Sequence, residues 1–172
     1  DVSLTQRMNG WGGGAWPRRV FGVVSRVGDG WAWYALILAM PLVDGRRGLA
    51  AGLHVAATAL VALVMYTALK RLTRRPRPFR GGNAIVAHVP PLDEYSFPSG
   101  HTLHAVSLSL VACTHYPLLV VVLAPLTLMI AASRVVLGLH YPSDVLAGAL
   151  LCSVVGALFA RRAAPAATPA RA

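Results

Sequence analysis

The sequence is poor in charged residues, and above all in acidic ones. Only 13% of its 172 residues are charged, whereas an ordinary soluble domain has about 25%. Asp and Glu number 6, against 16 Lys and Arg, and 56% of the residues are hydrophobic. This balance, with a mean hydropathy of +0.58, predicts a membrane protein. Nucleic acid is not an expected partner, because its binding domains need a mostly polar surface.

Cysteine is scarce as well. Cys113 and Cys152 both lie inside apolar runs, which indicates packed thiols rather than a disulfide or metal ligands. The first twenty residues contain arginines and glycines but no apolar stretch, so they do not resemble a cleavable signal peptide. The sequence shows no compact set of Asp, Glu and His ligands, and neither a metal nor another cofactor is expected.

Five apolar runs predict membrane-spanning helices. A helix needs about 20 apolar residues to cross the hydrocarbon layer, and Leu49–Leu69 meets this requirement most clearly. The other four runs are shorter: Trp31–Val43, Pro98–Cys113, Pro117–Ala132 and Val145–Ala160. The expected fold class is therefore all-α, an integral-membrane helical bundle.

The chain is expected to have three parts. Residues 1–28 are Gly-rich and basic and predict an interfacial segment, with a short helix around residues 20–27. Residues 29–162 form the membrane-embedded domain, and residues 163–172 form an Ala/Pro-rich disordered tail. In the last apolar run Gly148, Cys152 and Gly156 recur at spacing four, which lets helices approach closely in lipid.

Counting five crossings places the connections 71–97 and 134–143 on the same membrane face. The first connection is far longer than usual, and such loops tend to be functional. Its acidic and aromatic stretch Asp93–Phe97 would either shape a substrate entrance or form a solvated edge. Three polar segments adjoin this face: Lys70–Pro78, Pro98–His101 and Ser133–Asp144.

The segment Pro98–His101 predicts an anion site at the start of a helix. Pro98 suits the first helical turn, which would leave the N–H groups of Ser99, Gly100 and His101 free to bind an anion. Gly100 lets a phosphate approach the backbone, and the Ser99 hydroxyl adds a hydrogen bond. A plain helix-start turn with an incidental His101 explains this segment, taken alone, about as well.

The segment Ser133–Asp144 pairs a histidine with a carboxylate. His140 and Asp144 are four residues apart, close enough for the carboxylate to hold one imidazole N–H and expose the other nitrogen as a nucleophile. Arg134 at the membrane edge would be costly to bury alone, and a phosphate would be its partner. A snorkelling arginine and a capping aspartate are the simpler alternative.

Lys70 and Arg77 belong to a basic cluster that holds six of the 16 Lys and Arg residues. Positive residues commonly flank membrane spans, but a basic cluster beside apolar segments also suits lipid phosphate. All three segments make sense together around a single tetrahedral anion.

These residues resemble the PAP2 (type 2 phosphatidic acid phosphatase) superfamily. Its signature reads Lys-x6-Arg-Pro, Pro-Ser-Gly-His and Ser-Arg-x5-His-x3-Asp, and all three parts occur between residues 70 and 144. The resemblance implies a helical core shared with vanadium-dependent haloperoxidases. It also implies five to six transmembrane helices, since bacterial members usually have six, and metal-independent hydrolysis of a lipid phosphate or diphosphate.

The resemblance implies a role for each matched residue. His140 is the expected nucleophile that forms a phosphohistidine, Asp144 orients it, and His101 serves as general acid and then as base. The other residues would hold the phosphate oxygens; they are Lys70, Arg77, Ser99, Gly100 and Arg134.

Two other functions fit parts of this pattern. A haloperoxidase would be larger and soluble, which the apolar spans oppose, and a non-catalytic protein that binds anionic lipid head groups would need neither His140 nor His101. The substrate stays open among phosphatidate, phosphatidylglycerol phosphate, undecaprenyl diphosphate and a lipid A phosphate. The oligomeric state is also open.

The membrane orientation has two indications that disagree. Eleven of the 16 Lys and Arg lie on the face of the three segments, which by the positive-inside rule would make that face cytoplasmic. Several of the eleven are explained by phosphate binding, however, and the family's bacterial members usually face the periplasm. The expected location is the bacterial inner membrane, with the site on the periplasmic side.

Overall fold

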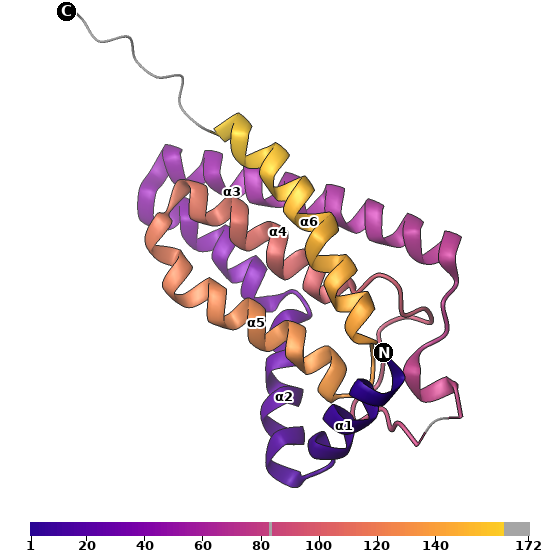
Figure 1. The fold of residues 1–172 in the computed structure, drawn as a ribbon. Coiled ribbons are helices and arrows are strands. Elements are labelled where there is room, and N and C mark those ends of the chain that lie inside the picture. The colour runs from indigo at the N-terminus through magenta and orange to yellow at the C-terminus, as the bar shows by residue number, and fades with distance from the viewer. Residues whose placement is uncertain (83, 164–172) are drawn as a thin grey trace, which may run out of the picture.

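The computed structural model describes residues 1–82 and 84–163, and this part of the chain is helical without any strand (Figure 1). The all-α fold class is therefore confirmed. The tail expected over residues 163–172 lies, apart from Ala163, outside the described residues. In chain order the helices are α1 (Val2–Gly12), α2 (Ala15–Gly28), α3 (Trp31–Thr73), η1 (Pro78–Arg80), α4 (Gly100–His115), η2 (Pro117–Leu119), α5 (Val120–Val136) and α6 (Pro142–Ala163).

Helix α3 consists of two antiparallel halves. The backbone leaves helical angles at Asp44–Gly45, in the polar turn that separates two of the apolar runs. Beyond this bend Gly48 lies against Met40, and Gly52 lies against Ile37. The first half of α3 thus leads to one end of the bundle, and the second half returns.

Helix α4 is the central helix and packs against α3, α5 and α6. Its side chains Ala105, Leu108, Val111 and Ala112 are buried, as expected for a helix with no polar face. We call the end of the bundle where α3 finishes and α4 and α6 begin the polar end (Figure 1). The end with the α3 bend and η2 is the far end.

Two described stretches have the length and hydropathy of a membrane span. They are Trp31–Arg80, whose most apolar 18 residues have a mean hydropathy of 2.0, and Pro117–Val136, where the same measure is 2.2. The first stretch contains both halves of α3, and Pro142–Val154 in α6 is apolar but shorter. The number of crossings stays a prediction.

The N-terminal helices pack on the C-terminal part of α5 at the polar end (Figure 1). Helix α2 includes the helix expected over residues 20–27, and it buries Phe21 and Ser25. From α1, the Asn9 side chain donates hydrogen bonds to the carbonyl oxygens of Val86 (2.8 Å) and Val136 (3.1 Å). These contacts bring the N-terminal residues beside the polar segments.

Helix α6 crosses the start of α4 at a distance that requires glycine. A Cβ at Gly148 would lie 2.8 Å from the carbonyl oxygen of Ser99, and a Cβ at Gly156 would lie 2.9 Å from Cδ1 of Leu110. Cys152 lies between these glycines in the chain and is fully buried. The close helix packing predicted from the spacing of small residues is confirmed.

Replacing Gly148 with alanine is expected to destabilise the protein by about 1–3 kcal/mol, the usual cost of overpacking. The atom that the new methyl group meets belongs to the backbone of Ser99, so α4 itself must shift. Thermal unfolding in detergent measures the effect. Gly10→Ala is the matched control, because a Cβ at Gly10 would meet no atom within 4 Å. Equal melting temperatures for the two variants would contradict the close approach.

Candidate active site

The three polar segments meet at the polar end of the bundle. The backbone N–H of Ser99 donates to the carbonyl oxygen of Asp144 (3.1 Å), which joins the starts of α4 and α6. Arg77 donates through Nη1 to the carbonyl oxygen of Leu139 (2.8 Å), which joins the first segment to the third. The convergence predicted from counting crossings is therefore present in the structure.

His140 lies in the turn between α5 and α6, and only 1% of it is exposed. The N–H groups of Leu139 and His140 both donate to the carbonyl oxygen of Arg134, at 3.0 Å. Gly138 in this turn has a φ of +74°, and a Cβ there would clash with the carbonyl oxygen of Val86. The turn thus needs glycine, and it sets the position of His140 relative to α5.

The two ring nitrogens of His140 face different groups. Nε2 lies 3.2 Å from Nη1 of Arg77. Nδ1 lies 3.7 Å from Oδ2 of Asp144 and has no hydrogen-bond partner among the described residues. Asp144 is fully buried and accepts hydrogen bonds from Arg75 Nη1 (2.7 Å) and the Tyr141 N–H (2.9 Å). A small movement would bring the carboxylate into hydrogen-bond contact with the ring.

The environment of His140 keeps its imidazole neutral. Burial lowers the pKa of His140 well below the usual histidine value, and the charges of Arg134, Arg77 and Lys70 lower it further. A neutral imidazole at neutral pH has a free nitrogen lone pair, as a nucleophile requires. Asp144 lies where its charge would stabilise the ring once the ring becomes cationic.

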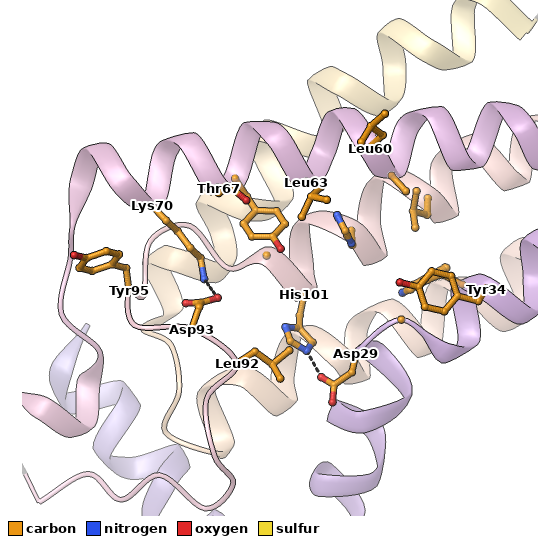
Figure 2. A pocket seen from close by; sticks show the side chains of 18 of the residues that line it. Asp29, Tyr34, Leu60, Leu63, Thr67, Lys70, Leu92, Asp93, Tyr95 and His101 are labelled. Atoms are coloured by element: carbon orange, nitrogen blue, oxygen red, sulfur yellow. Dashed lines mark hydrogen bonds and ion pairs between the residues drawn. The ribbon is translucent and has the colours of Figure 1, made fainter.

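Lys70 and Arg77 both bind the carboxylate of Asp93. Lys70 Nζ donates to Oδ2 (2.6 Å), and Arg77 Nη2 donates to Oδ1 (2.8 Å); Figure 2 shows Lys70 and Asp93 pointing toward each other. Burial by itself would raise the pKa of Asp93, but the hydrogen bonds and charges of the two cations hold it below its usual value. These ion pairs therefore stabilise the fold at neutral pH and weaken only as the pH falls through that lowered pKa.

Arg134 lies in the last turn of α5, and only 2% of its surface is exposed. Its Nη1 donates to the Ser25 hydroxyl of α2 (2.5 Å), and its Nε has no hydrogen-bond partner among the described residues. A buried guanidinium without an anionic contact is costly. A bound anion would supply the missing contact.

Ser99 caps α4, with its hydroxyl accepting the Thr102 N–H at 3.5 Å. Two details of the sequence prediction are wrong here. Pro98 precedes the cap and does not lie in the first helical turn, and the Ser99 N–H is not free because it donates to Asp144. Only the N–H groups of the next two residues stay at the helix N-terminus, where an anion can bind.

His101 extends into a cavity of about 690 Å³, which Lys70 also lines. Its Nε2 lies 2.5 Å from Oδ1 of Asp29, and the two side chains point toward each other in Figure 2. One end of the cavity is polar, and the rest has apolar walls from α3 and α4. The apolar lining includes Trp33, Ile37, Leu60, Leu63 and Leu108.

Sequence reasoning did not assign three of the contacting residues to the site: Ser25, Asp29 and Arg75. The scarcity of acidic residues could have indicated Asp29. Of the six acidic residues in the chain, five lie at the polar end, each with a basic side chain within ion-pair distance. They are Asp1, Asp29, Asp93, Glu94 and Asp144. In a chain so poor in acids, each carboxylate outside the far end is a candidate partner of the basic cluster.

Buried cations surround a histidine at one end of an apolar helical bundle, an arrangement suited to a phosphate group. The sequence model of the PAP2 superfamily matches residues 50–166, which is more than half of the chain. The chain belongs to the PAP2 superfamily, and the protein is a membrane lipid phosphatase.

Similar proteins agree with this class. The decaprenylphosphoryl-5-phosphoribose phosphatase of Mycobacterium tuberculosis is 40% identical over 132 residues, which are 75% of this chain and 69% of that protein. The undecaprenyl-diphosphatase of Sulfolobus acidocaldarius is 29% identical over 139 residues, 78% of this chain and 65% of that protein. The crystal structure of a transmembrane PAP2-type phosphatidylglycerolphosphate phosphatase from Bacillus subtilis has the same fold. Its TM-score is 0.75 at 22% identity, with 91% of this chain and 83% of that chain covered.

Proposed function

We propose that the protein removes the terminal phosphate from a polyprenyl-linked phosphate or diphosphate, through a phosphohistidine on His140. The observation that carries this proposal is the setting of His140. It is buried and neutral, with Nε2 toward Arg77 and Nδ1 toward Asp144. The two relatives named above act, by their names, on decaprenyl and undecaprenyl substrates, which favours a polyprenyl carrier over a glycerolipid.

The reaction has two steps. In the first, Nε2 of His140 attacks phosphorus in line, the P–N bond forms as the P–O bond breaks, and His101 gives a proton to the leaving oxygen. Asp144 stabilises the imidazolium that results. In the second step His101 takes a proton from water, the water oxygen bonds to phosphorus, and the P–N bond breaks to release inorganic phosphate.

Lys70, Arg77 and Arg134 stabilise the charge on the phosphate oxygens during both steps. Such stabilisation is most of what phosphoryl transfer requires. All three side chains are buried, so water screens their charges little. Two of them now hold Asp93, and this carboxylate must move away when a phosphate binds.

The cavity offers a place for the lipid tail. Its apolar walls lead from His101 along both halves of α3. Tyr34, Leu60 and Leu63 line the cavity and are also exposed, so apolar surface continues outward from it (Figure 2). A long prenyl chain bound there would keep its phosphate at the polar end.

Phosphate release from the full chain in detergent tests the function. The panel is undecaprenyl diphosphate, decaprenylphosphoryl-5-phosphoribose, phosphatidate and phosphatidylglycerol phosphate, each with EDTA present. Release from a polyprenyl substrate that survives EDTA supports the proposal. Release from the glycerolipids alone would overturn the substrate class. No release from any of the four would favour the alternative that the protein binds lipid head groups without hydrolysing them.

Asp93→Asn is expected to tighten inhibition by vanadate about tenfold, which corresponds to about 1.4 kcal/mol. Vanadate stands in for five-coordinate phosphorus, and the variant removes the internal carboxylate that competes for Lys70 and Arg77. The concentration of vanadate that halves activity is measured without EDTA. Glu94→Gln is the matched control, because Glu94 pairs with Arg80 (3.1 Å) and not with Lys70 or Arg77. Weaker inhibition of Asp93→Asn would mean that Asp93 supports the cations instead of competing with phosphate.

The proposed site faces the periplasm. Counted over all Lys and Arg, the positive-inside rule would make the site's face cytoplasmic, but Lys70, Arg77 and Arg134 are buried in the site and do not indicate topology. The proposal follows the superfamily's bacterial members, which usually have the site on the periplasmic side; the far end, with Arg46 and Arg47 beside the α3 bend, is then cytoplasmic. A Glu94→Cys variant in intact spheroplasts tests the orientation with a membrane-impermeant maleimide. Labelling of this cysteine before lysis supports a periplasmic site, and labelling only after lysis contradicts it.

A further inference from the structure

Asp29 contacts the second histidine of the site. It lies between α2 and α3, and its Oδ1 is 2.5 Å from Nε2 of His101, 72 positions along the chain. The His101 side chain is 11% exposed and that of Asp29 is 31% exposed, so water screens this pair only in part. Asp29 stands outside the residues that match the superfamily model, 50–166.

The position of Asp29 is held by the packing of α2. A Cβ at Gly28 would lie 3.2 Å from Cγ2 of Ile130 in α5, which leaves no room for the end of α2 to shift inward. The hydroxyl of Ser25, one turn earlier, accepts a hydrogen bond from Arg134. The carboxylate is thus presented to His101 by a helix end that is fastened to α5.

His101 faces cations as well as carboxylates. The titratable groups around it come from every neighbouring element; they are Asp29 next to α2, Tyr66 and Lys70 of α3, Asp93 of the loop before α4, His104 of α4, Arg134 of α5 and His140 of the following turn. A general acid must carry its proton when the substrate arrives, but burial of the ring and the nearby charges of Arg134 and Lys70 oppose this. Asp93 is already bound to two cations. Asp29 is the carboxylate in direct contact with the His101 ring.

We infer that Asp29 is a positioning residue for His101, which holds Nε2–H and stabilises the protonated ring. This inference rests on the proposed function. With Nε2–H bound to Asp29, the proton on Nδ1 passes to the leaving lipid oxygen as the P–O bond breaks and the P–N bond to His140 forms. The neutral ring keeps Nε2–H. In the second step Nδ1 takes a proton from the attacking water, which restores the imidazolium. Each histidine of the site thus has its own carboxylate.

The test compares two leaving groups in kcat/KM, which reports the steps up to departure of the leaving group. Dodecyl phosphate has an alkoxide leaving group that needs a proton, whereas the aryl oxide of 4-nitrophenyl phosphate leaves without one. Asp29→Asn is expected to lower kcat/KM for dodecyl phosphate at least about tenfold, which is part of the roughly hundredfold or more that general acid catalysis contributes. It should lower kcat/KM for 4-nitrophenyl phosphate much less. Asp44→Asn at the far end is the matched control.

The pH profile supplies a second readout. A carboxylate partner favours the charged imidazole. Loss of the Asp29 carboxylate should therefore move the alkaline limb of the kcat/KM profile for dodecyl phosphate about one pH unit lower. Asp29→Glu keeps the charge and should restore the limb in part. Equal losses for both substrates with an unmoved limb would show that Asp29 is merely structural and overturn the inference. Tighter vanadate inhibition of Asp29→Asn would overturn it too, since Asp29 would then be a competitor for the anion site.

A measurement without turnover separates this inference from the proposed function. The titration of His101 is followed by NMR of the full-length, ring-labelled protein in detergent, with His101→Gln to assign its signal. The midpoint is expected to lie at lower pH in Asp29→Asn than in the original protein. If the original protein releases no phosphate, the proposed function fails while this titration still decides the pairing. An identical midpoint in both proteins would overturn the pairing.

Discussion

His140→Ala is expected to lower phosphate release at least about a thousandfold, as loss of a nucleophile does in other covalent mechanisms. His101 cannot take its place without a rearrangement, because its Nε2 is bound to Asp29. The fold should persist, since the side chain of His140 has a single hydrogen-bond contact within residues 1–82 and 84–163, with Arg77. Its removal leaves a cavity next to that arginine, so a modest decrease in melting temperature is expected as well.

Trapping the intermediate tests the nucleophile directly. Rapid quenching with a substrate labelled in its terminal phosphate should give labelled protein that is stable in alkali and loses its label in acid, as a phosphohistidine does. The label should be absent from His140→Ala and present in His54→Ala, a matched control at the far end, where His54 contacts His115 (3.0 Å). An acid-stable label, or a label that persists in His140→Ala, would place the phosphate on another residue.

Asp144→Asn is expected to lower kcat about ten-thousandfold, as neutralising the carboxylate behind a catalytic histidine does in the serine-protease triad. An amide cannot stabilise the imidazolium that forms at His140, and its N–H₂ group can hold the ring in the wrong tautomer. Asp144 is fully buried, so little water is present to replace its charge. Loss of the 2.7 Å ion pair with Arg75 adds a structural cost.

Arg75→Gln separates these two effects. It breaks the same ion pair but keeps the carboxylate behind His140, and Arg75 is partly exposed, at 32%. The expected loss of kcat is therefore at least about tenfold smaller than in Asp144→Asn, because the charge that stabilises the imidazolium of His140 is kept. Melting temperatures of both variants are measured alongside the rates. Equal losses of kcat would mean that Asp144 acts only through its structural contact with Arg75.

Several features of this protein follow from local sequence. The five apolar runs predict an all-α membrane fold because their length and hydropathy leave few other structures for the backbone in lipid. Pro142 starts α6 and places Asp144 about one turn from His140, so this pair depends on five consecutive residues. Gly148 predicts a close helix crossing, because a small residue allows close approach whichever helix lies opposite. That this helix is α4 is known only from the structure.

At the start of α4, the local sequence pattern predicts the structure only in part. Proline is favoured in the first helical turn, yet Pro98 lies before the cap because Ser99 donates its N–H to Asp144 on another helix. A tertiary hydrogen bond thus overrides a local preference. The motif was found at the right place, but the groups left free to bind an anion were different.

The contacts that Asp29, Asp93 and Ser25 make could be found only from the tertiary structure. Ser25 meets Arg134 across 109 positions, and Asp29 meets His101 across 72. No local pattern marks a single acid between two glycines as the partner of a distant histidine. Which carboxylate reaches which cation is decided by the packing of α2 on α5 and by the course of the loop before α4, and therefore by the free energy of the whole bundle. The sequence by itself determined the membrane fold and the motifs proposed to bind phosphate, because these rest on residues close together in the chain. Which carboxylates pair with the cations and histidines of those motifs was decided only by tertiary packing.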